Sequence, residues 1–455
     1  MLLLTDFGST YTKLVAVNIK ELKIIGSANS MTTVDTDIMI GFNIALTKLK
    51  NKIGYNIKFK ERIASSSAAG GLRVVAIGLV PKLTAEAAQL AALKAGAKIV
   101  GVFTYRLSEH QLEMISNLAP DIILLSGGID GGNEEWILHN AKILAKLQED
   151  IPIVLAGNKY TTPKAKEILI SKNKDVYITE NVLPDLNKIN VEPAREAIRK
   201  IFIEKIIYGK GIDKAQKYMD KKIMPTPVAV LKGAELLADG IDKEKGIGEL
   251  MVVDVGGATT DIYSVNKGIS PDRGIIYKGL PQPYAKRTVE GDLGVRYNAP
   301  NLIKMVEDKE LKKINSSLNI KDWIKHINRA VNILPDTKEK IVLDEIMARK
   351  AVEVAVERHA GVLETINIPG STKVFQRGKD LRNIKYVIGT GGPITYSKNP
   401  YEILKGCLLI ENDKNLLKPI RPNLLVDREY IFSAMGLMAY KYPLEALKIM
   451  KKHLK

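Results

Sequence analysis

A short pattern that occurs twice, once near the N-terminus and once past the middle of the chain, constrains the fold most. In each copy an apolar strand ends at an aspartate, glycine and hydroxyl residues follow, and a second strand begins. The copies are Asp6-Phe7-Gly8-Ser9-Thr10-Tyr11-Thr12-Lys13 and Asp254-Val255-Gly256-Gly257-Ala258-Thr259-Thr260-Asp261. Each copy opens one half of the 455-residue chain, so the pattern predicts two related halves.

The residue types in these turns suit a triphosphate with Mg²⁺. Glycine lets backbone N–H groups approach phosphate, and serine and threonine add hydroxyl donors. Aspartate cannot donate to phosphate, but two acids facing each other can hold the hydrated shell of Mg²⁺. We therefore predict Asp6 and Asp254 as catalytic residues and metal ligands for Mg²⁺. We predict that the phosphates of ATP are contacted by Gly8, Ser9, Thr10 and Lys13 on one side and by Gly256, Gly257 and Thr259 on the other.

Either turn alone is equally compatible with an ordinary tight β-hairpin, in which aspartate and glycine are also favoured. It is the pair that favours a nucleotide site. The P-loop spacing of glycines, lysine and hydroxyl residue is absent. A third turn, Gly389-Thr390-Gly391-Gly392-Pro393, follows a short strand without an acid, and we assign Gly389, Gly391 and Gly392 to the adenosine. By itself this turn is weak evidence, because Gly-Gly-Pro is common in loops.

Length and composition limit the remaining possibilities. The chain is long enough for two to four domains, and no apolar run reaches the roughly 18 residues of a membrane span. A single cysteine, Cys407, fits a reducing compartment, so we expect a cytoplasmic protein without a membrane partner. The net charge of +17 is spread along the chain and aromatic residues make up only 6%, which favours a lysine-rich solvated surface over a nucleic-acid site.

Strands and helices alternate between the first hairpin and the middle of the chain, which predicts a parallel sheet covered on both faces. The expected strands are Leu72–Ile77, Lys98–Phe103, Ile122–Leu125, Ile151–Leu155 and Val176–Ile178, and the expected helices are Thr84–Ala95, Ser108–Asn117, Glu134–Gln148 and Thr162–Ser171. Further helices are expected at Thr36–Lys50, with Ile40, Ile44 and Leu49 as its apolar stripe, at Val228–Ala238, and last in the chain at Ile431–Ala439.

The domain boundaries follow from this alternation. We expect residues 1–61 to begin the N-terminal half, residues 62–190 to form an inserted α/β domain, and residues 191–247 to return to the N-terminal half with a connecting helix. Residues 248–455 then form the C-terminal half, with a helical insertion at about 300–380.

The segments DFGSTYTKLVAV, VVDVGGATTDIYSV and VIGTGGP resemble the two phosphate motifs and the adenosine motif of the actin, hexokinase and DnaK superfamily. Their order implies an α/β fold of duplicated, actin-like (ribonuclease H-like) ATPase domains, here with an inserted parallel α/β domain. TPVAVLKGAELLADG lies where that superfamily places its first connecting helix, and Ala229, Gly233 and Ala234 would allow a close helix crossing there. An ordinary packed helix explains these small residues equally well.

The whole chain also resembles the MutL-type accessory proteins of glutamate mutase, through LLLTDFGSTYTK, ASSSAAGGLRV, LLSGGIDGGN, LAGN, RTVEGDLG and VIGTGGP. This resemblance implies an ATP-dependent chaperone that reactivates an adenosylcobalamin-dependent mutase by exchanging damaged cobalamin. A small-molecule kinase and an actin-like scaffold remain alternatives, and a homodimer is left open.

The sequence offers several candidates for the catalytic carboxylate of the expected site. DnaK-type chaperones have a glutamate at the start of the connecting helix, where this chain has Met224-Pro225-Thr226. Glu235, Glu290 and Asp292 are the candidates that remain, and we choose Glu290. Without an acid at the usual place, a slow, Mg-dependent ATPase is expected.

The strand–helix layout of the inserted domain looks like that of the cobalamin-binding domain of the mutases, but the Asp-x-His-x-x-Gly signature is missing. His110 stands at the start of a helix and is more typical of a surface residue. We consider that this domain imitates the mutase domain, or that it is a generic insertion. Gly127, Gly128, Gly131 and Gly132 around Asp130 fit an anion site or a plain loop equally well.

Overall fold

The computed structural model describes residues 1–8, 10–33, 36–67, 72–95, 97–186, 188–201, 212–312, 314, 318–368, 371–410, 413 and 415–454. Of the predicted site residues, only Ser9 lies outside these described ranges.

The N-terminal half is built on a five-stranded sheet. Its strands are β1 (Leu2–Phe7), β2 (Tyr11–Asn18), β3 (Lys23–Met31), β4 (Glu61–Ser66) and β10 (Met224–Pro225), in the order β10-β4-β1-β2-β3. β1, β2 and β3 are antiparallel neighbours, whereas β4 runs parallel to β1 and β10 runs parallel to β4. α1 (Ile38–Ile53) packs against β2 and β3, and α8 (Asp213–Tyr218) packs against α1.

The C-terminal half repeats this arrangement. Its strands are β13 (Leu250–Val255), β14 (Thr260–Val265), β16 (Ala285–Glu290), β19 (Tyr386–Thr390) and β20 (Asn423–Val426), in the order β16-β14-β13-β19-β20. Again the first three strands in the chain are antiparallel neighbours and the last two are added in parallel. Equal strand order and direction in both halves confirm the predicted duplicated, actin-like fold.

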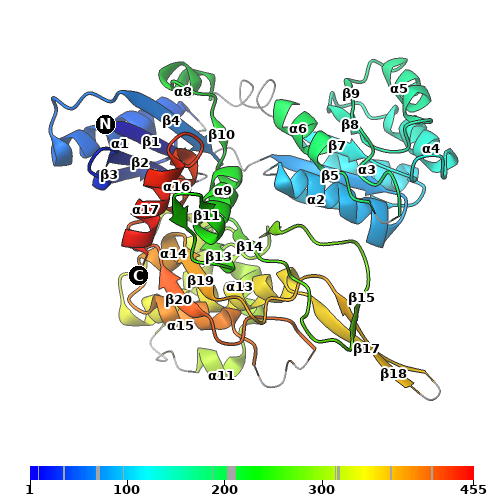
Figure 1. The fold of residues 1–455 in the computed structure, drawn as a ribbon. Helices are drawn as coiled ribbons and strands as arrows, with labels where there is room; N and C mark the ends of the chain where they lie inside the picture. Colours follow the sequence, from blue (N-terminus) through cyan, green and yellow to red (C-terminus); the bar gives the residue numbers. More distant parts are fainter. Residues whose placement is uncertain are drawn as a thin grey trace.

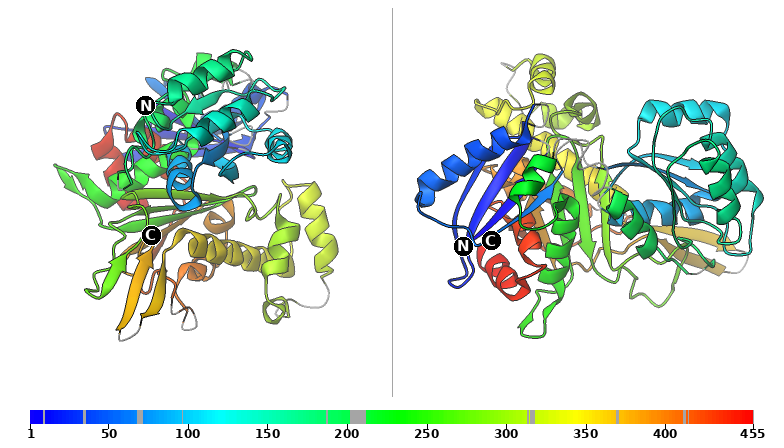
Figure 2. Two further views of the ribbon diagram at one scale, coloured as in Figure 1. Left: turned by 90° about the vertical axis from the view of Figure 1, so that its right-hand side faces the viewer. Right: turned by 90° about the horizontal axis from the view of Figure 1, so that it is seen from above.

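The inserted domain forms a separate lobe beside the two halves (Figure 1 and Figure 2). Its strands are β5 (Arg73–Gly78), β6 (Lys98–Thr104), β7 (Ile122–Leu125), β8 (Ile153–Leu155) and β9 (Val176–Ile178). They pair in parallel in the order β6-β5-β7-β8-β9, as the alternating sequence predicts. The helices are η2 (Pro81–Ala85), α2 (Glu86–Lys94), α3 (Glu109–Leu118), α4 (Glu135–Leu144), α5 (Thr162–Ile170) and α6 (Glu192–Ile201).

The structure places both boundaries of the inserted domain later in the chain than predicted, after residue 66 instead of 61 and after residue 201 instead of 190. β4 pairs along its whole length with β1, so residues 62–66 belong to the first sheet. α6 packs against α2 and β8, so residues 192–201 cover the inserted sheet instead of returning to the N-terminal half. In both places the partner that decides the assignment is distant in sequence.

Two helices cross between the sheets of the two halves. α9 (Thr226–Asp239) contacts α16 (Phe432–Met438), and both join the apolar core that the two halves share (Figure 1). A Cβ added to Gly233 would lie 3.3 Å from Gly436 Cα, so the backbones meet closely, as the small residues of α9 suggested. The prediction of Ile431–Ala439 as the last helix was wrong, because Pro443 begins α17 (Pro443–His453), which packs against α9 and α16.

The segment predicted as a helical insertion also contains strands. Its helices are α10 (Ala299–Leu302), η4 (Ile303–Met305), α11 (Asp308–Leu311), α12 (Ile320–Arg329) and α13 (Lys338–His359). After them β17 (Val362–Ile368) and β18 (Ser371–Arg377) form a projecting hairpin with β15 (Ile275–Tyr277) (Figure 1). The smaller elements are β11 (Gly240–Ile241), β12 (Glu244–Lys245), α14 (Gly392–Thr395), α15 (Pro400–Leu404) and η5 (Lys405–Cys407).

The apolar stripe predicted for α1 is only partly correct. Ile40 and Ile44 are 49% and 45% exposed, whereas Leu49 is buried. The helix instead turns Phe42 and Leu46 toward the sheet, where the Phe42 ring packs 5.9 Å from that of Phe7. Both sets of apolar residues are compatible with helical spacing. The sheet beneath α1 is in contact with the set that contains the Phe42 ring.

Candidate nucleotide-binding site

The two predicted phosphate turns close in the same way. In the first, the N–H of Gly8 donates to the carbonyl oxygen of Tyr11 at 3.1 Å. In the second, the N–H of Gly256 donates to the carbonyl oxygen of Thr259 at 2.9 Å. Each closing glycine stands two residues after the aspartate, so the two acids hold equivalent positions at the ends of β1 and β13.

Asp6 is buried, with 6% of its surface exposed, and is oriented by two hydroxyl groups. Its Oδ1 accepts a hydrogen bond from Thr226 Oγ1 at 2.6 Å and one from Ser65 Oγ at 3.1 Å. Thr226 is the first residue of α9, at the place where DnaK-type chaperones carry a glutamate. The sequence shows that the acid is missing at this place, but its pattern does not show that this threonine binds Asp6.

Asp254 has a different environment. It is half-buried, and none of the other described residues donates a hydrogen bond to its carboxylate. Burial and the neighbouring charge of Asp261, its cross-strand partner, raise its pKa to about 7. A half-buried carboxylate to which no described residue donates is stabilised by a cation, so Asp254 fits the predicted role beside Mg²⁺.

Within the described ranges no group of three or more His, Cys, Asp or Glu side chains is placed to hold a metal ion. Two acids with water molecules filling the remaining positions match the way Mg²⁺ is usually bound beside phosphates. The donor set therefore fits a hydrated Mg²⁺ at Asp6 and Asp254 and does not form an all-protein cage.

The carbonyl groups of the second turn are engaged by the segment that follows β16. The backbone N–H of Val295 donates to the oxygen of Gly256, and those of Arg296 and Tyr297 donate to the oxygen of Gly257. Asn298 Nδ2 donates to the carbonyl oxygen of Ala258 at 3.1 Å. With these acceptors occupied and the Gly256 N–H closing the turn, the N–H groups of Gly257 and Ala258, which donate to no other described residue, remain for an anion.

The three glycine turns converge in space, although about 250 and 130 residues separate them in the sequence. A Cβ added to Gly257 would lie 3.8 Å from Thr10 Oγ1, so the two phosphate turns face each other across the halves. A Cβ on Gly391 would lie 2.7 Å from Asp254 Oδ1, which places the third turn directly against the second acid. A Cβ on Gly392, in contrast, would meet nothing within 4 Å and faces open space.

Asp427 binds the third turn through a side-chain hydrogen bond. This buried residue accepts a hydrogen bond from Thr390 Oγ1 at 3.0 Å. It also accepts from the backbone N–H groups of Ile431 and Phe432, each at 2.9 Å, and so caps the start of α16. The adenosine turn and the second crossing helix are thus held by one carboxylate that the sequence analysis did not identify.

Lys13 reaches into the site from β2. Its Nζ lies 3.7 Å from Asp6 Oδ2 and 3.6 Å from the centroid of the Tyr430 ring. Burial alone would lower the pKa of Lys13, but Tyr430, Asp6 and Asp254 outweigh this and raise it, so the amine is charged. Lys13 therefore meets the requirement for a phosphate-binding cation.

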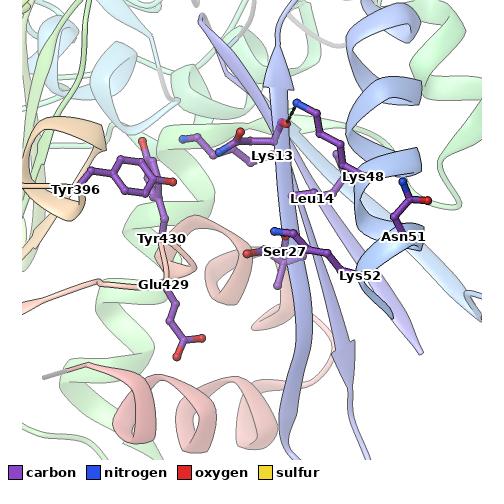
Figure 3. A pocket seen from close by; sticks show the side chains of 12 residues that line it. Lys13, Leu14, Ser27, Lys48, Asn51, Lys52, Tyr396, Glu429 and Tyr430 are labelled. Atoms are coloured by element: carbon purple, nitrogen blue, oxygen red, sulfur yellow. Dashed lines mark hydrogen bonds between the residues drawn. The ribbon is translucent and has the colours of Figure 1, made fainter. Parts of the chain in front are cut away.

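An open pocket of about 440 Å³ adjoins Lys13 between the two halves (Figure 3). Tyr396 and Tyr430 line one side, with their ring centroids 6.1 Å apart, and Lys48, Asn51 and Lys52 of α1 line the other. Tyr396 directly follows α14 and the third turn, and is 66% exposed. Its open ring face offers an apolar surface of the kind on which a nucleobase stacks.

Glu290 lies at the end of β16, opposite Thr260 on β14 and therefore next to the second turn. Arg358 of α13 donates to Glu290 Oε2 at 2.7 Å and also to both carboxylate oxygens of Asp292. Burial raises the pKa of Glu290 despite this arginine. Its catalytic role stays a prediction, as does that of every residue in the predicted site.

The remaining candidates lie away from this centre. His110 is on α3 of the inserted domain with 81% of its side chain exposed. Asp130 accepts hydrogen bonds from the backbone N–H of Lys159 and from Asn181 Nδ2, both on other loops of the inserted domain. Glu235 on α9 lies 3.9 Å from Lys232, and burial raises its pKa.

The family model described as MutL protein matches residues 2–454. Protein MutL of Clostridium tetanomorphum is 49% identical over 455 residues, which cover 99% of this chain and 98% of that protein. This chain belongs to the MutL family. It is the family that the sequence resemblance indicated.

Two solved structures with low sequence identity also match this chain. Ethanolamine utilization protein EutJ from Carboxydothermus hydrogenoformans is 12% identical with a TM-score of 0.29, over 97% of this chain and 89% of that one. Xylulose kinase from Bifidobacterium adolescentis is 9% identical with a TM-score of 0.32, over 97% and 92%. At these scores the fold assignment rests on the two sheets themselves.

Across the described residues, no helix has the length and apolar character needed to cross a bilayer.

Proposed function

We propose that this protein is an ATP-dependent reactivating factor for an adenosylcobalamin-dependent mutase of the glutamate mutase or aminomutase type. Family membership supports the mutase as partner. The observation that carries the ATP requirement is the convergence of three glycine turns on Asp6 and Asp254 between two similar halves. The buried, unpaired Cys407 agrees with the cytoplasmic location that we propose.

The side chains of the site divide the work between the halves. Asp6, fixed by Thr226 and Ser65, and Asp254, which accepts from no other described side chain or N–H group, would hold the Mg²⁺ shell from opposite sides. When bound, Mg²⁺ neutralises phosphate charge and so favours phosphoryl transfer to water. Thr10 and Lys13 would position the phosphates from the N-terminal half, while Gly256, Gly257 and Thr259 would do so from the C-terminal half.

Because the phosphate ligands come from both halves, occupancy of the site would draw the halves together. The Gly233–Gly436 crossing of α9 and α16 is the contact about which they would move. We propose that this closing, and the opening that follows hydrolysis, loosens the mutase so that damaged cobalamin leaves and intact cofactor enters. A slow, switch-like ATPase agrees with a connecting helix that begins with threonine instead of an acid.

The inserted domain is our candidate for the mutase contact. Its five parallel strands support the layout on which the resemblance to a cobalamin-binding domain was based. In place of the cobalamin signature, β5 is followed by Leu79-Val80-Pro81, which has no histidine. Imitation of the mutase domain therefore stays a hypothesis, and normal mutase capture by a protein lacking residues 72–180 would refute it.

The test of the proposed function is recovery of an inactivated enzyme. Purified protein, ATP, Mg²⁺ and adenosylcobalamin are mixed with a glutamate mutase blocked by hydroxocobalamin, and mutase activity is followed. We expect recovery that requires ATP and is lost in Asp6→Ala and Asp254→Ala. Asp272→Ala is the matched control, because Asp272 is an exposed partner of Arg382 away from the turns. ATP binding without any recovery would reject the reactivating role and leave the nucleotide site standing.

A further inference from the structure

A buried arginine of β16 joins the C-terminal half to the inserted domain. Arg287 is 5% exposed, and its Nη1 donates to the carbonyl oxygen of Ala97 at 2.9 Å, directly before β6. Its Nε and Nη2 both donate to Asp261 Oδ1, at 2.9 and 2.7 Å. One planar guanidinium group therefore binds both Asp261 of the C-terminal half and Ala97, which lies 190 residues before Arg287 in the sequence.

Asp261 connects this arginine to the second phosphate turn. Its Oδ2 accepts a hydrogen bond from Thr259 Oγ1 at 3.0 Å, and only 8% of its surface is exposed. Thr259 is one of the residues that we predict to contact phosphate. An unbroken chain of hydrogen bonds thus runs from Thr259 through Asp261 and Arg287 to the backbone of the inserted domain.

The first link of this chain has two exclusive arrangements. A threonine hydroxyl group carries a single proton, and in the structure Thr259 donates it to Asp261. To donate to a phosphate oxygen the hydroxyl group must leave the aspartate. Asp261 then keeps a buried charge with one donor fewer. Its hydrogen bonds with the Arg287 guanidinium group become stronger, whereas the bond from Arg287 to the Ala97 carbonyl oxygen does not.

Further contacts between the C-terminal half and the inserted domain lie beside Arg287. A shift of Arg287 would therefore also alter these contacts. α2 of the inserted domain contacts β16, and Gln282 Nε2 donates to Glu86 Oε1 at 3.1 Å. A Cβ added to Gly291, just after β16, would lie 2.4 Å from Lys98 Cε at the start of β6. The first residues of β6 and the first turn of α2 are thus held against the edge strand of the C-terminal sheet.

We propose that Thr259, Asp261 and Arg287 couple occupancy of the phosphate site to the position of the inserted domain, with Arg287 as the positioning residue. ATP draws the Thr259 hydroxyl group away from Asp261 Oδ2, the Arg287 guanidinium group shifts toward this freed oxygen, and the contact with Ala97 loosens. This inference rests on the proposed ATP binding. It assigns to the inserted domain a movement that depends on the nucleotide.

Hydrogen–deuterium exchange on the full-length protein tests the coupling. ATP affinity is measured first by calorimetry with Mg²⁺, and amide exchange is then compared with and without saturating Mg-ATP. In the wild-type protein we expect ATP to speed exchange in peptides covering 86–104. In Arg287→Gln we expect ATP to bind with comparable affinity and this difference to disappear.

Arg287→Lys is the second variant, because it keeps the buried charge beside Asp261 but lacks the planar fork that reaches both partners. It also remains informative if the glutamine variant unfolds. Arg382→Gln is the control, since Arg382 is held by Asp380 and Asp272 outside this chain of contacts. An ATP-dependent change that persists in both Arg287 variants, or that is absent from a wild-type protein that binds ATP, overturns the coupling. Lack of ATP binding by the wild-type protein overturns the proposed function and the coupling with it.

Discussion

The ammonium group of Lys13, on a strand of the N-terminal half, lies 3.6 Å from the centroid of the Tyr430 ring in the C-terminal half. Tyr430 has a left-handed backbone conformation (φ 54°) just before α16, which is uncommon for a bulky residue. The pairing holds Lys13 beside Asp6 and spans the two halves at the base of the nucleotide site. A strained aromatic residue that positions a charged side chain is a direct target for mutation.

Replacing Tyr430 by leucine should weaken ATP binding. The ring orients Lys13, and a cation–π contact of about 0.5–2 kcal/mol corresponds to a loss of about 2- to 30-fold in affinity. Tyr430→Phe keeps the ring and should bind ATP nearly as well as the wild-type protein. Calorimetric titration of both variants with Mg-ATP measures the difference, and equal affinities would show that the ring does not position Lys13.

Asp254→Asn should change the stability of the protein and its ATP binding in opposite directions. Because the folded-state pKa of Asp254 is raised to about 7, the folded protein keeps a proton that the unfolded chain releases near pH 4. This residue therefore lowers the free energy of unfolding as pH rises from about 4 to 7, by at most about 1.4 kcal/mol per pH unit. The asparagine variant should lose Mg-dependent ATP binding and yet gain stability relative to the wild type at pH 8.

Urea unfolding of the wild type and of Asp254→Asn at pH 5 and pH 8 measures this gain. Other titrating groups cancel in the difference between the two proteins. A stability difference that is equal at both pH values would contradict the raised pKa.

Gly391→Ala should lower stability, whereas Gly392→Ala should weaken ATP binding without lowering stability. Gly391 has φ 90°, and a Cβ there would lie 2.1 Å from the carbonyl oxygen of Val255, so alanine should cost at least about 2 kcal/mol of stability. Gly392 faces open space, so its alanine variant should keep the wild-type melting temperature but bind ATP less tightly. Thermal unfolding and ATP titration of both variants test this, and a destabilised Gly392→Ala would argue against an open adenosine surface.

Glu290→Gln should slow ATP hydrolysis without weakening ATP binding. A general base contributes about 10²–10⁴-fold to rate, and the raised pKa of Glu290 favours proton acceptance. Asp292→Asn is the matched control, because Asp292 binds the same arginine but its side chain is 46% exposed. Single-turnover hydrolysis compares the two variants, and equal rates would remove Glu290 from the catalytic residues.

Local sequence determined the two hairpins, their glycines and the alternating strands of the inserted domain. An aspartate followed by glycine and hydroxyl residues between two apolar strands admits few backbone arrangements, and strand–helix alternation requires a parallel sheet. The repeat of Asp6 and Gly8 in Asp254 and Gly256 therefore indicated the duplicated halves, which the two sheets confirm, and it predicts the acids of the candidate site.

Only the tertiary structure decided which residues that are distant in sequence contact one another at the candidate site and at the inserted domain. Thr226 reaches Asp6 across 220 residues, Arg287 reaches Ala97 across 190, and Tyr430 meets Lys13 from the far end of the chain. The side of α1 that is buried likewise depended on the sheet beneath it. Such contacts arise where separate elements pack, and hydrogen-bonding capacity or helical spacing along one segment does not specify the partner on another.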